Sequence, residues 1–464
     1  MDFSEPYKTS GPPPAYSPDG RYLAAAVEYR LIIREAESLQ VVQLYSCLDR
    51  IDHIEWSPNS MYCLAAMYSR AIVQVWSADQ SDWACKIDEG PAGVAAARWS
   101  PDGSCVLAYA SMGIRTTVWS LAQRRCHYLA GCKSGAADPS HTSSSFSPAA
   151  GFSPDGTQYA QLERYDCVDH ISVYETEGWS RTAHFKADTS DAARLLWSPT
   201  GESIALTDDA LYFGVAVYSP AGVALGRYGP PGEQYDGLGV KTAVWDPSGQ
   251  FLAVGSYDQR VRVLSDVTWQ PLLDGAHPAV VCEPPGLAVY MEEVQGPEAR
   301  GTPGRSPAKS PSAAPPLALR PEIKSKYELS ELPVRVPHVT PSMDKPHPKL
   351  GVGRLSWSPD GRYLVTVNDN MPTHVWVWDL AAGCLATLLA HAAPVADVAW
   401  RPEGHLLAAV TGCAKVYMWA PAGASVVHIP LRGFAAARLA WSPGGGSFTL
   451  MGGDAFCCAY LAQA

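Results

Sequence analysis

Trp99-Ser100-Pro101-Asp102-Gly103 is a short turn between two apolar segments, and variants of this turn recur along the whole chain. Its proline presets φ at the second turn position, and its glycine tolerates positive φ, so the motif forms a hairpin corner. Consecutive prolines of these turns lie 40 to 53 residues apart, except for one step of 112 residues. Such a period is typical of four-stranded propeller blades. The nine copies begin at Tyr16, Trp56, Trp99, Phe152, Trp197, Trp245, Trp357, Trp400 and Trp441.

Strand-like stretches follow each turn, for example Ile72-Val73-Gln74-Val75-Trp76 and His374-Val375-Trp376-Val377-Trp378. Short runs of β-branched and aromatic residues between turns indicate strands, and no long helical periodicity competes with them. The predicted fold is all-β, a single large β-propeller of about nine blades, with seven or eight as alternatives. Met1 to Tyr7 is expected to complete the last blade beside Ala459-Tyr460-Leu461.

The 112-residue step between Pro247 and Pro359 marks an insertion before the last three repeats. We assign blades one to six to 1–283, a Pro/Ser-rich and largely disordered insertion to 284–348, and blades seven to nine to 349–464, closing the ring with the N-terminus. The middle of the insertion is rich in Pro, Ser, Ala and Gly, so it buries too little apolar surface to offset ordering entropy. Strand-like segments at 287–290 and 326–329 would let the chain leave and re-enter through an irregular hairpin.

Composition restricts the class of protein. The net charge of −11 disfavours nucleic-acid and anionic-membrane partners, which attract basic surfaces. The 12 cysteines include no Cys-x-x-Cys pair, so buried free thiols in a reducing compartment are favoured over structural zinc. An acidic N-terminus and the lack of any long apolar run predict a soluble cytosolic or nuclear protein.

Catalytic motifs are incomplete. Gly131-Cys132-Lys133-Ser134 lacks the glycine that must precede the lysine of a phosphate-binding loop. Gly351-Val352-Gly353 leads into a strand, whereas a dinucleotide site needs a helix N-terminus. The chain has no Gly-x-Ser-x-Gly elbow, and its 12 histidines are dispersed. The sequence therefore predicts no enzyme, no cofactor, no metal site and no small-molecule substrate.

The repeats resemble the WD-repeat family, in which a Trp-Asp dipeptide ends the third strand of a blade. Only Trp378-Asp379 matches in full, and the family's Gly-His pair survives as Ala276-His277 and Ala390-His391. These positions hold a blade together and say little about function. The candidate structural residues are Trp56, Trp99, Trp197, Trp245, Trp357, Trp378, Asp379, Trp400 and Trp441.

Longer strings carry a closer resemblance over the whole chain. Examples are Gln43-Leu44-Tyr45-Ser46-Cys47-Leu48-Asp49, Lys86-Ile87-Asp88-Glu89-Gly90 and Asn368-Asp369-Asn370-Met371-Pro372. They resemble the family of WD repeat-containing protein eight, the centrosomal and spindle-pole WD-repeat proteins. The resemblance implies a non-enzymatic scaffold in the cytoplasm and cytoskeleton, at the centrosome (microtubule-organising centre), spindle pole and basal body. It would anchor microtubule minus ends and support spindle assembly and ciliogenesis. The implied partners are a coiled-coil microtubule-anchoring protein, with a kinesin-14 motor and the gamma-tubulin complex as further candidates.

The insertion holds three candidate phosphorylation sites, Thr302, Ser306 and Ser310, each followed by proline. Residues 296–326 carry a net charge of +4, which three phosphates at about −1.5 to −2 each would reverse. We hypothesise a mitotic charge switch there, against the alternative of an inert linker. A scaffold of the translation-initiation type, associated with RNA or ribosomes, is the alternative function, and the acidic net charge disfavours it. The residues that bind a partner are not predicted.

Overall fold

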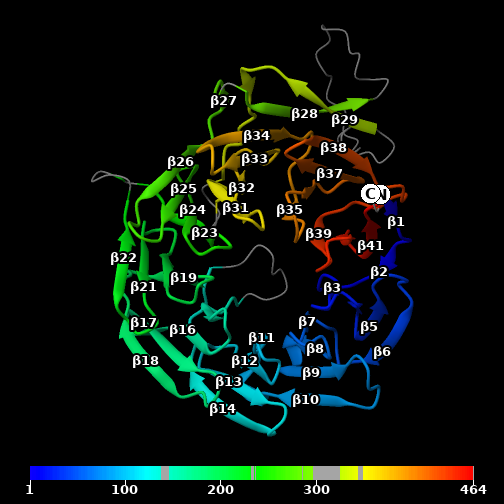
Figure 1. Ribbon diagram of the computed structural model, residues 1–464. Coiled ribbons are helices and arrows are strands. Elements are labelled where there is room, and N and C mark those ends of the chain that lie inside the picture. Colours follow the sequence, from blue (N-terminus) through cyan, green and yellow to red (C-terminus); the bar gives the residue numbers. More distant parts are fainter. Residues whose placement is uncertain are drawn as a thin grey trace. The chain divides into compact units, whose positions relative to one another are not determined.

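The computed structural model describes residues 1–136, 146–230, 235, 237–284, 286–295, 324–342 and 348–462. The helical elements within them are two short 3₁₀ turns, η1 (Tyr68–Arg70) and η2 (Gly90–Ala92), and the remaining elements are strands. The strands of this described part form nine successive blade sheets, each with four antiparallel strands (Figure 1). The predicted all-β fold class is therefore confirmed, with nine blades.

Blades one to six belong largely to one compact unit, Lys8–Asp258 with Arg262–Leu272. Blades one to three are β3 (Ala15–Tyr16), β4 (Tyr22–Val27), β5 (Arg30–Glu35), β6 (Val41–Ser46); β7 (His53–Trp56), β8 (Tyr62–Met67), β9 (Ile72–Ser77), β10 (Ala84–Asp88); and β11 (Ala96–Trp99), β12 (Cys105–Tyr109), β13 (Arg115–Ser120), β14 (Arg125–Ala130). Blades four to six are β15 (Ala150–Phe152), β16 (Gln158–Tyr165), β17 (Val168–Glu175), β18 (Arg181–Lys186); β19 (Ala192–Trp197), β20 (Ile204–Asp208), β21 (Val215–Tyr218), β22 (Ala224–Tyr228); and β23 (Val240–Trp245), β24 (Phe251–Ser256), β25 (Arg260–Ser265), β26 (Pro271–Ala276).

The second compact unit, Met1–Tyr7, Gln259–Val261 and Leu273–Ala464, holds blades seven to nine. Blades seven and eight are β31 (Val352–Trp357), β32 (Tyr363–Asn368), β33 (His374–Asp379), β34 (Cys384–Ala390); and β35 (Asp397–Trp400), β36 (Leu407–Val410), β37 (Lys415–Ala420), β38 (Gly423–His428). Blade nine is β39 (Arg438–Trp441), β40 (Ser447–Met451), β41 (Ala455–Tyr460) and β1 (Asp2–Phe3), with β2 (Tyr7–Lys8) also paired to β41.

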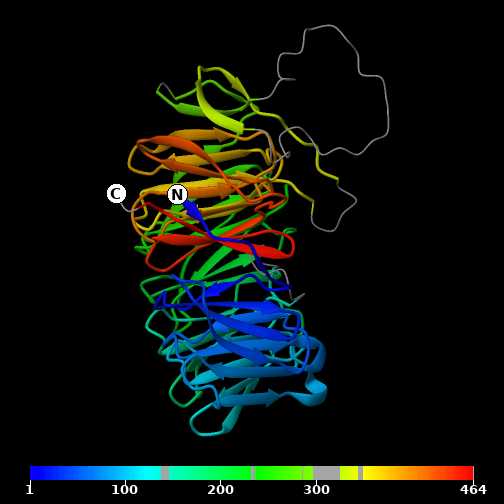
Figure 2. The ribbon, with the colours of Figure 1, turned by 90° about the vertical axis from the view of Figure 1, so that its right-hand side faces the viewer.

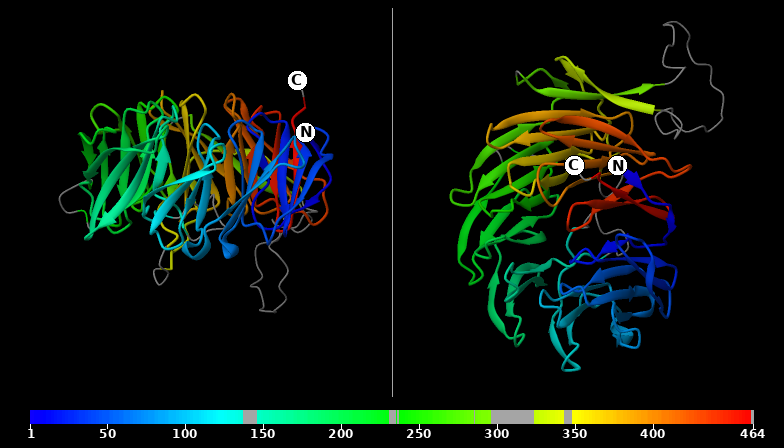
Figure 3. Two further views of the ribbon diagram at one scale, coloured as in Figure 1. Left: turned by 90° about the horizontal axis from the view of Figure 1, so that it is seen from below. Right: turned by 45° about the vertical axis from the view of Figure 1, so that its right-hand side comes forward.

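The N-terminus supplies the outer strand of the last blade. Asp2 lies opposite Tyr460 and Phe3 opposite Ala459 in an antiparallel pair. The first residues (blue) therefore lie beside the last strand (red), as Figure 2 shows from the side and Figure 3 from two further directions. The chain thus uses one end to complete the sheet made by the other.

The turn motif closes each hairpin corner with its own side chains. In Trp99-Ser100-Pro101-Asp102-Gly103, the Gly103 amide donates to the Ser100 carbonyl at 2.9 Å, with φ of 71° at Gly103. The Ser100 Oγ accepts from the Cys105 amide at 2.9 Å, and the Asp102 carboxylate accepts from the Ser104 amide at 3.1 Å. Serine and aspartate supply the side-chain bonds, proline presets φ and glycine adopts positive φ readily, which is why most copies of the turn keep these residue types.

The middle strands of each blade are buried because they pack against adjacent blades, so most of their residues are apolar, and the polar ones among them, such as Glu163 and Thr366, are buried as well. In the first two blades, Leu31 and Ile33 of β5 share a core with Ile54 and Trp56 of β7 and Cys63 of β8. Outer strands alternate between buried and exposed residues, as β10 does. The core therefore consists of layers between neighbouring blades.

The described residues of the insertion add strands to blade seven. A small pair is formed by β27 (Val280–Val281) and β30 (Val334–Arg335). A longer antiparallel hairpin is formed by β28 (Ala288–Gln295) and β29 (Lys324–Ser330), and β28 also pairs in parallel with β34. The sheet order becomes β29-β28-β34-β33-β32-β31, and Figure 2 shows the hairpin (yellow-green) next to the strands of blade seven. The strand-like segments beside the insertion thus do form a hairpin.

Candidate protein-interaction site

Six of the turn tryptophans connect their blade to the one before it. The indole Nε1–H donates to a backbone carbonyl in the first strand of the preceding blade, and the ring fills the layer between the two. Such a bond fixes the spacing of two first strands without using any side chain of the partner strand. The bonds run from Trp56 to Ala15 (2.9 Å), Trp99 to Glu55 (3.2 Å), Trp197 to Gly151 (2.9 Å), Trp245 to Leu196 (3.4 Å), Trp400 to Ser356 (3.1 Å) and Trp441 to Ala399 (3.2 Å).

Trp357 occupies the same place in blade seven and is buried, with 7 % of its surface exposed. Trp378 has a different position, because it ends the third strand of that blade. Asp379 accepts hydrogen bonds from the Ala381 amide at 2.9 Å and from Arg362 at 3.2 Å, which holds the following turn. The structure thus places all nine candidate residues in blade strands and gives none of them an open, reactive environment.

A buried relay links Trp378 to the preceding outer strand. Its Nε1–H donates to the Thr366 Oγ1 at 3.1 Å, and the Thr366 hydroxyl donates to the His277 Nε2 at 2.7 Å. The His277 Nδ1–H in turn donates to the Gln259 carbonyl at 2.7 Å. Burial lowers the pKa of His277 to about 4, so the ring is neutral and can both accept and donate.

His391 is the corresponding histidine one blade later, and it uses a residue of the insertion as its partner. Its Nδ1–H donates to the Thr373 carbonyl at 3.0 Å, and its Nε2 accepts from the Tyr327 hydroxyl of β29 at 2.7 Å. Burial lowers the pKa of His391 to about 4 as well. The Tyr327 ring also packs against Tyr417, at 5.8 Å between ring centroids. Tyr327 of the hairpin therefore binds the Nε2 of His391 just as Thr366 binds the Nε2 of His277.

A buried ion pair fixes the hairpin to blade eight. The Lys415 ammonium lies 2.9 Å from the Glu292 carboxylate, and their side chains are only 2 % and 1 % exposed. Glu292 also accepts from the Ser325 hydroxyl at 2.6 Å and the Ala392 amide at 2.8 Å. Burial alone would raise the pKa of Glu292, but these hydrogen bonds and the Lys415 charge outweigh it, so its pKa is lowered.

These contacts determine where the insertion leaves and rejoins the blades. Gln295 and Lys324 lie opposite each other in the register of β28 and β29. The Ser325 amide, at the start of β29, donates to the His428 Nε2 of β38 at 2.9 Å. The segment between Gln295 and Lys324 therefore begins and ends on one firmly held hairpin. The candidate phosphorylation sites Thr302, Ser306 and Ser310 belong to that segment and lie outside the described residues.

Lys133, the lysine of the string that resembles a phosphate-binding loop, has structural partners. Lys133 of the loop-like string binds the Asp169 carboxylate at 3.1 Å, the Asp191 carboxylate at 2.5 Å and the Ala192 carbonyl at 2.6 Å. Arg164 joins the same two carboxylates at 2.9 and 2.8 Å. In the part of the chain that the structure describes, no group of three or more His, Cys, Asp or Glu residues could hold a metal ion.

Two further expectations concern cysteines and membranes. Seven of the cysteines are buried free thiols, three are intermediate, and Cys167 and Cys282 are exposed, so the expectation of buried thiols holds for most of them but not for these two. Both exposed cysteines lie in connections between strands. None of the helical elements in the described ranges is long and apolar enough to cross a membrane.

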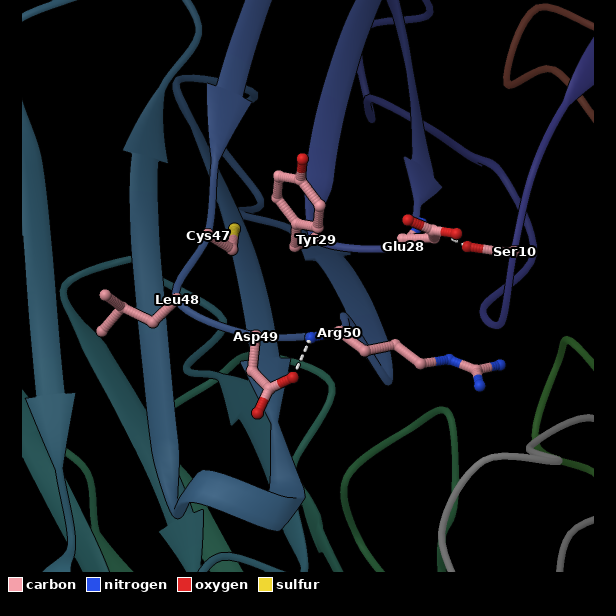
Figure 4. Close-up of a pocket in the computed structure, with 7 residues that line it drawn as sticks. All are labelled: Ser10, Glu28, Tyr29, Cys47, Leu48, Asp49 and Arg50. Carbon is pink, nitrogen blue, oxygen red and sulfur yellow. Dashed lines mark hydrogen bonds between the residues drawn. The ribbon is translucent and has the colours of Figure 1, made fainter.

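An open pocket of about 560 Å³ lies in the loops of blade one, as Figure 4 shows. Asp49 accepts from the Arg50 amide at 2.7 Å and pairs with Arg70 at 2.8 Å. The hydrogen bond from Arg70 is the main reason that the pKa of Asp49 is lowered. These residues offer polar and apolar contacts to a ligand rather than a nucleophile with its base. The pocket is lined by Ser10, Glu28, Tyr29, Cys47, Leu48, Asp49 and Arg50.

Sequence reasoning missed the residues that dock the insertion. Glu292 and Lys415 are 123 positions apart, and no local spacing relates them. The one available signal was the lysine that opens the apolar strand Lys415-Val416-Tyr417-Met418-Trp419, because a lysine in a buried strand requires a counter-charge. That signal predicts an acidic partner but does not say which one.

The blade sheets, the indole bonds and the Trp378 relay define a WD-repeat β-propeller protein. The family model described as WD domain, G-beta repeat matches residues 233–265 and 382–419. A solved structure of the C-terminal WD40 domain of Sif2 shares this fold, with a TM-score of 0.51 over 99 % of each chain at 10 % identity.

A full-length relative narrows the family. The WD repeat-containing protein WRAP73 of Mus musculus is 40 % identical over 469 residues, which covers 99 % of this chain and 96 % of the relative. An uncharacterized WD repeat-containing protein of Schizosaccharomyces pombe, C32H8.09, is 21 % identical over all of this chain and 93 % of the relative. The chain belongs to the WD repeat-containing protein family that includes mouse WRAP73.

Proposed function

We propose that this WD-repeat protein is a non-enzymatic scaffold of the centrosome, spindle pole and basal body, of the type of WD repeat-containing protein eight. It helps to anchor microtubule minus ends and supports spindle assembly and ciliogenesis. Its partners are a coiled-coil microtubule-anchoring protein and, as further candidates, a kinesin-14 motor and the gamma-tubulin complex. The observation that carries the proposal is the resemblance of the strings between the turns, such as Lys86-Ile87-Asp88-Glu89-Gly90, which generic WD repeats do not share.

The structure supports the coarser part of this proposal, a protein that acts by binding other proteins. Blade edges and connecting loops offer several docking surfaces, and function concentrates on such surfaces in repeat proteins. Lys133, the charged residue of the string that resembles a phosphate-binding loop, is paired within the fold, and Arg164 shares its carboxylate partner Asp169. The chain's net charge of −11 favours a protein partner over RNA.

The proposed mitotic switch belongs to the insertion. Phosphates on Thr302, Ser306 and Ser310 would turn a segment of net +4 into an acidic one. Gln295 and Lys324, on either side of the segment, lie opposite each other on the hairpin. We expect mass spectrometry of the protein from mitotic cells to find these residues modified. Unmodified residues in mitotic protein would contradict the switch.

Proximity labelling from the full chain in dividing cells tests the scaffold proposal. A labelling enzyme fused to the protein should modify pericentriolar and microtubule-anchoring proteins, and the free enzyme is the control. Ribosomal proteins in their place would support the alternative, a scaffold of the translation-initiation type.

A further inference from the structure

The outer strand of blade one, β6 (Val41–Ser46), has an open backbone edge. It is the last strand in the sheet order β3-β4-β5-β6. The Cys47 amide donates to the Tyr29 carbonyl at 2.7 Å, and Ser46 lies opposite Arg30 in the register. Hydrogen-bonded and non-hydrogen-bonded pairs alternate in an antiparallel ladder, so the amide and carbonyl groups of Leu44 and Ser46 point away from β5. They are available to a further strand.

The side chains along this edge are uncharged, and the large exposed ones are apolar. Leu44 is 56 % exposed, and Val41 and Val42 are 52 % and 44 % exposed. Proteins usually protect such edges with charged residues, which oppose pairing with other chains. Every other outer strand of the first six blades carries at least one charge, namely Lys86 and Asp88 in β10, Arg125 in β14, Arg181 and Lys186 in β18, Arg227 in β22 and Asp274 in β26.

The strand is held rigidly, so little ordering would accompany binding. Tyr45 is buried, its ring stacks on Trp76 at 4.6 Å between centroids, and its hydroxyl donates to the Ser77 carbonyl at 2.7 Å. Just beyond the strand, the Leu48 amide donates to the Gln74 Oε1 at 3.0 Å. These contacts hold β6 against blade two at Tyr45 and, just beyond the strand, at Leu48. A preorganised edge loses less conformational entropy when a partner binds.

The strand leads directly into the open pocket of blade one. Cys47 and Leu48, which follow Ser46, line the pocket together with Tyr29 (Figure 4). An extended peptide on the β6 edge would therefore run toward a cavity of about 560 Å³. Backbone pairing with a strand edge gives affinity, and a pocket for a side chain gives specificity.

The chain itself completes two outer edges in this way. In blade seven, β28 adds in parallel to β34, and in blade nine, β1 adds to β41. The strand β28 is an additional strand on the four of blade seven, whereas β1 is the fourth strand of blade nine and comes from the other end of the chain. Strand addition at an outer edge is thus a mode of assembly that this fold already uses, and β6 is an edge without such a strand among the described residues.

We propose that the β6 edge binds an extended, uncharged segment of a partner protein, with alternating apolar side chains, by strand addition. An uncharged segment fits because β6 offers no counter-charge, and an unpaired charge would lose hydration on binding. A second copy of this chain is a poorer occupant. A six-residue edge is about 20 Å long, so two blade edges would bury less than the roughly 1,000 Å² of a stable interface. This inference rests on the proposed scaffold function and names one of its binding surfaces.

Peptide selection on the purified full-length protein tests the inference. The probe is a phage-displayed library of random 12-residue peptides, followed by fluorescence anisotropy with the labelled synthetic winner. We expect uncharged peptides of alternating apolar residues, whose affinity falls at least tenfold in Leu44→Lys, because a lysine blocks the edge. Leu225→Lys on β22 is the matched control, a similarly exposed leucine at 45 %, and it should change the affinity less than twofold.

Three outcomes would overturn the inference. They are failure to enrich any peptide, equal affinity for Leu44→Lys and the unchanged protein, and a concentration-dependent dimer in sedimentation that Leu44→Lys abolishes. The last would mean that a second copy occupies the edge. Leu44 is exposed, so the variant should fold, and equal thermal unfolding temperatures check this. The test uses purified protein, so it does not depend on where the protein lies in the cell. If proximity labelling contradicted the centrosomal role, the peptide-binding result would still be interpretable.

Discussion

At the scale of single residues, hydrogen bonds in dry surroundings hold the blades. Thr366 and Thr116 are both fully buried threonines on blade strands. Thr366 connects Trp378 to His277. The Thr116 hydroxyl has no hydrogen-bond partner in the described part of the chain. Comparing the two positions therefore separates the stability contributed by a hydrogen-bonded buried hydroxyl from the stability lost by burying a hydroxyl without a partner.

Thr366→Val should destabilise the protein by about 2 to 4 kcal/mol, because it leaves two buried nitrogens, of Trp378 and His277, without partners. Thr116→Val is the matched control and should be neutral or slightly stabilising, since it removes an unsatisfied hydroxyl. Urea unfolding at neutral pH measures both. A loss for Thr116→Val as large as that for Thr366→Val would show that the relay contributes nothing beyond shape.

At the scale of elements, the hairpin β28–β29 is part of the propeller and not only the base of an insertion. It adds to β34, its Tyr327 completes the bonds of His391, and its Glu292 neutralises Lys415. Removing one member of a buried ion pair costs more than the pair contributes, because the remaining charge is uncompensated. Docking of the hairpin therefore depends on both charges being present.

Lys415→Met should cost about 3 to 5 kcal/mol, and the double variant Glu292→Met with Lys415→Met should recover much of that loss. Arg227→Ala, which breaks an exposed pair with Asp188 of 58 % and 77 % exposed side chains, is the control and should cost less than about 1 kcal/mol. Chemical denaturation of the unchanged protein, Glu292→Met, Lys415→Met and the double variant gives the coupling energy. A double variant as unstable as Lys415→Met would contradict the ion-pair account.

The same coupling should depend on pH in a defined direction. The pKa of Glu292 is lowered from its ordinary value of 4.5, so its contribution to stability is complete above 4.5. It is lost only as the pH falls through the lowered folded value. The coupling energy should therefore be the same at pH 7 and pH 5 and should decrease in stronger acid.

The residues of the turns made the fold predictable from the sequence, whereas contacts between distant segments could not be predicted from it. The Ser-Pro-Asp-Gly turns and the tryptophans recur at the blade period, so their spacing predicted about nine blades, with seven or eight as alternatives. The hairpin strands were visible as apolar alternation at 287–290 and 326–329. The parallel pairing of β28 with β34 and the contact of Tyr327 with His391 depend on segments 64 or more residues apart, which local patterns do not encode. The open edge of β6 could be recognised only from the order of the strands in its sheet.

At the scale of the whole molecule, repetition produces a rigid set of surfaces. Indole hydrogen bonds tie neighbouring blades together at six junctions in the described part of the chain. The N-terminal strand β1 completes blade nine. The surfaces that differ between blades are the hairpin of the insertion and the uncharged edge of blade one. Such differences are what a scaffold needs to bind distinct partners.

The measurement that tests the scaffold account most directly is quantitative proximity labelling in mitotic cells, read against the free labelling enzyme. We predict that pericentriolar and microtubule-anchoring proteins are enriched over ribosomal proteins. Enrichment of ribosomal proteins, or labelling no different from the free enzyme, would contradict the account.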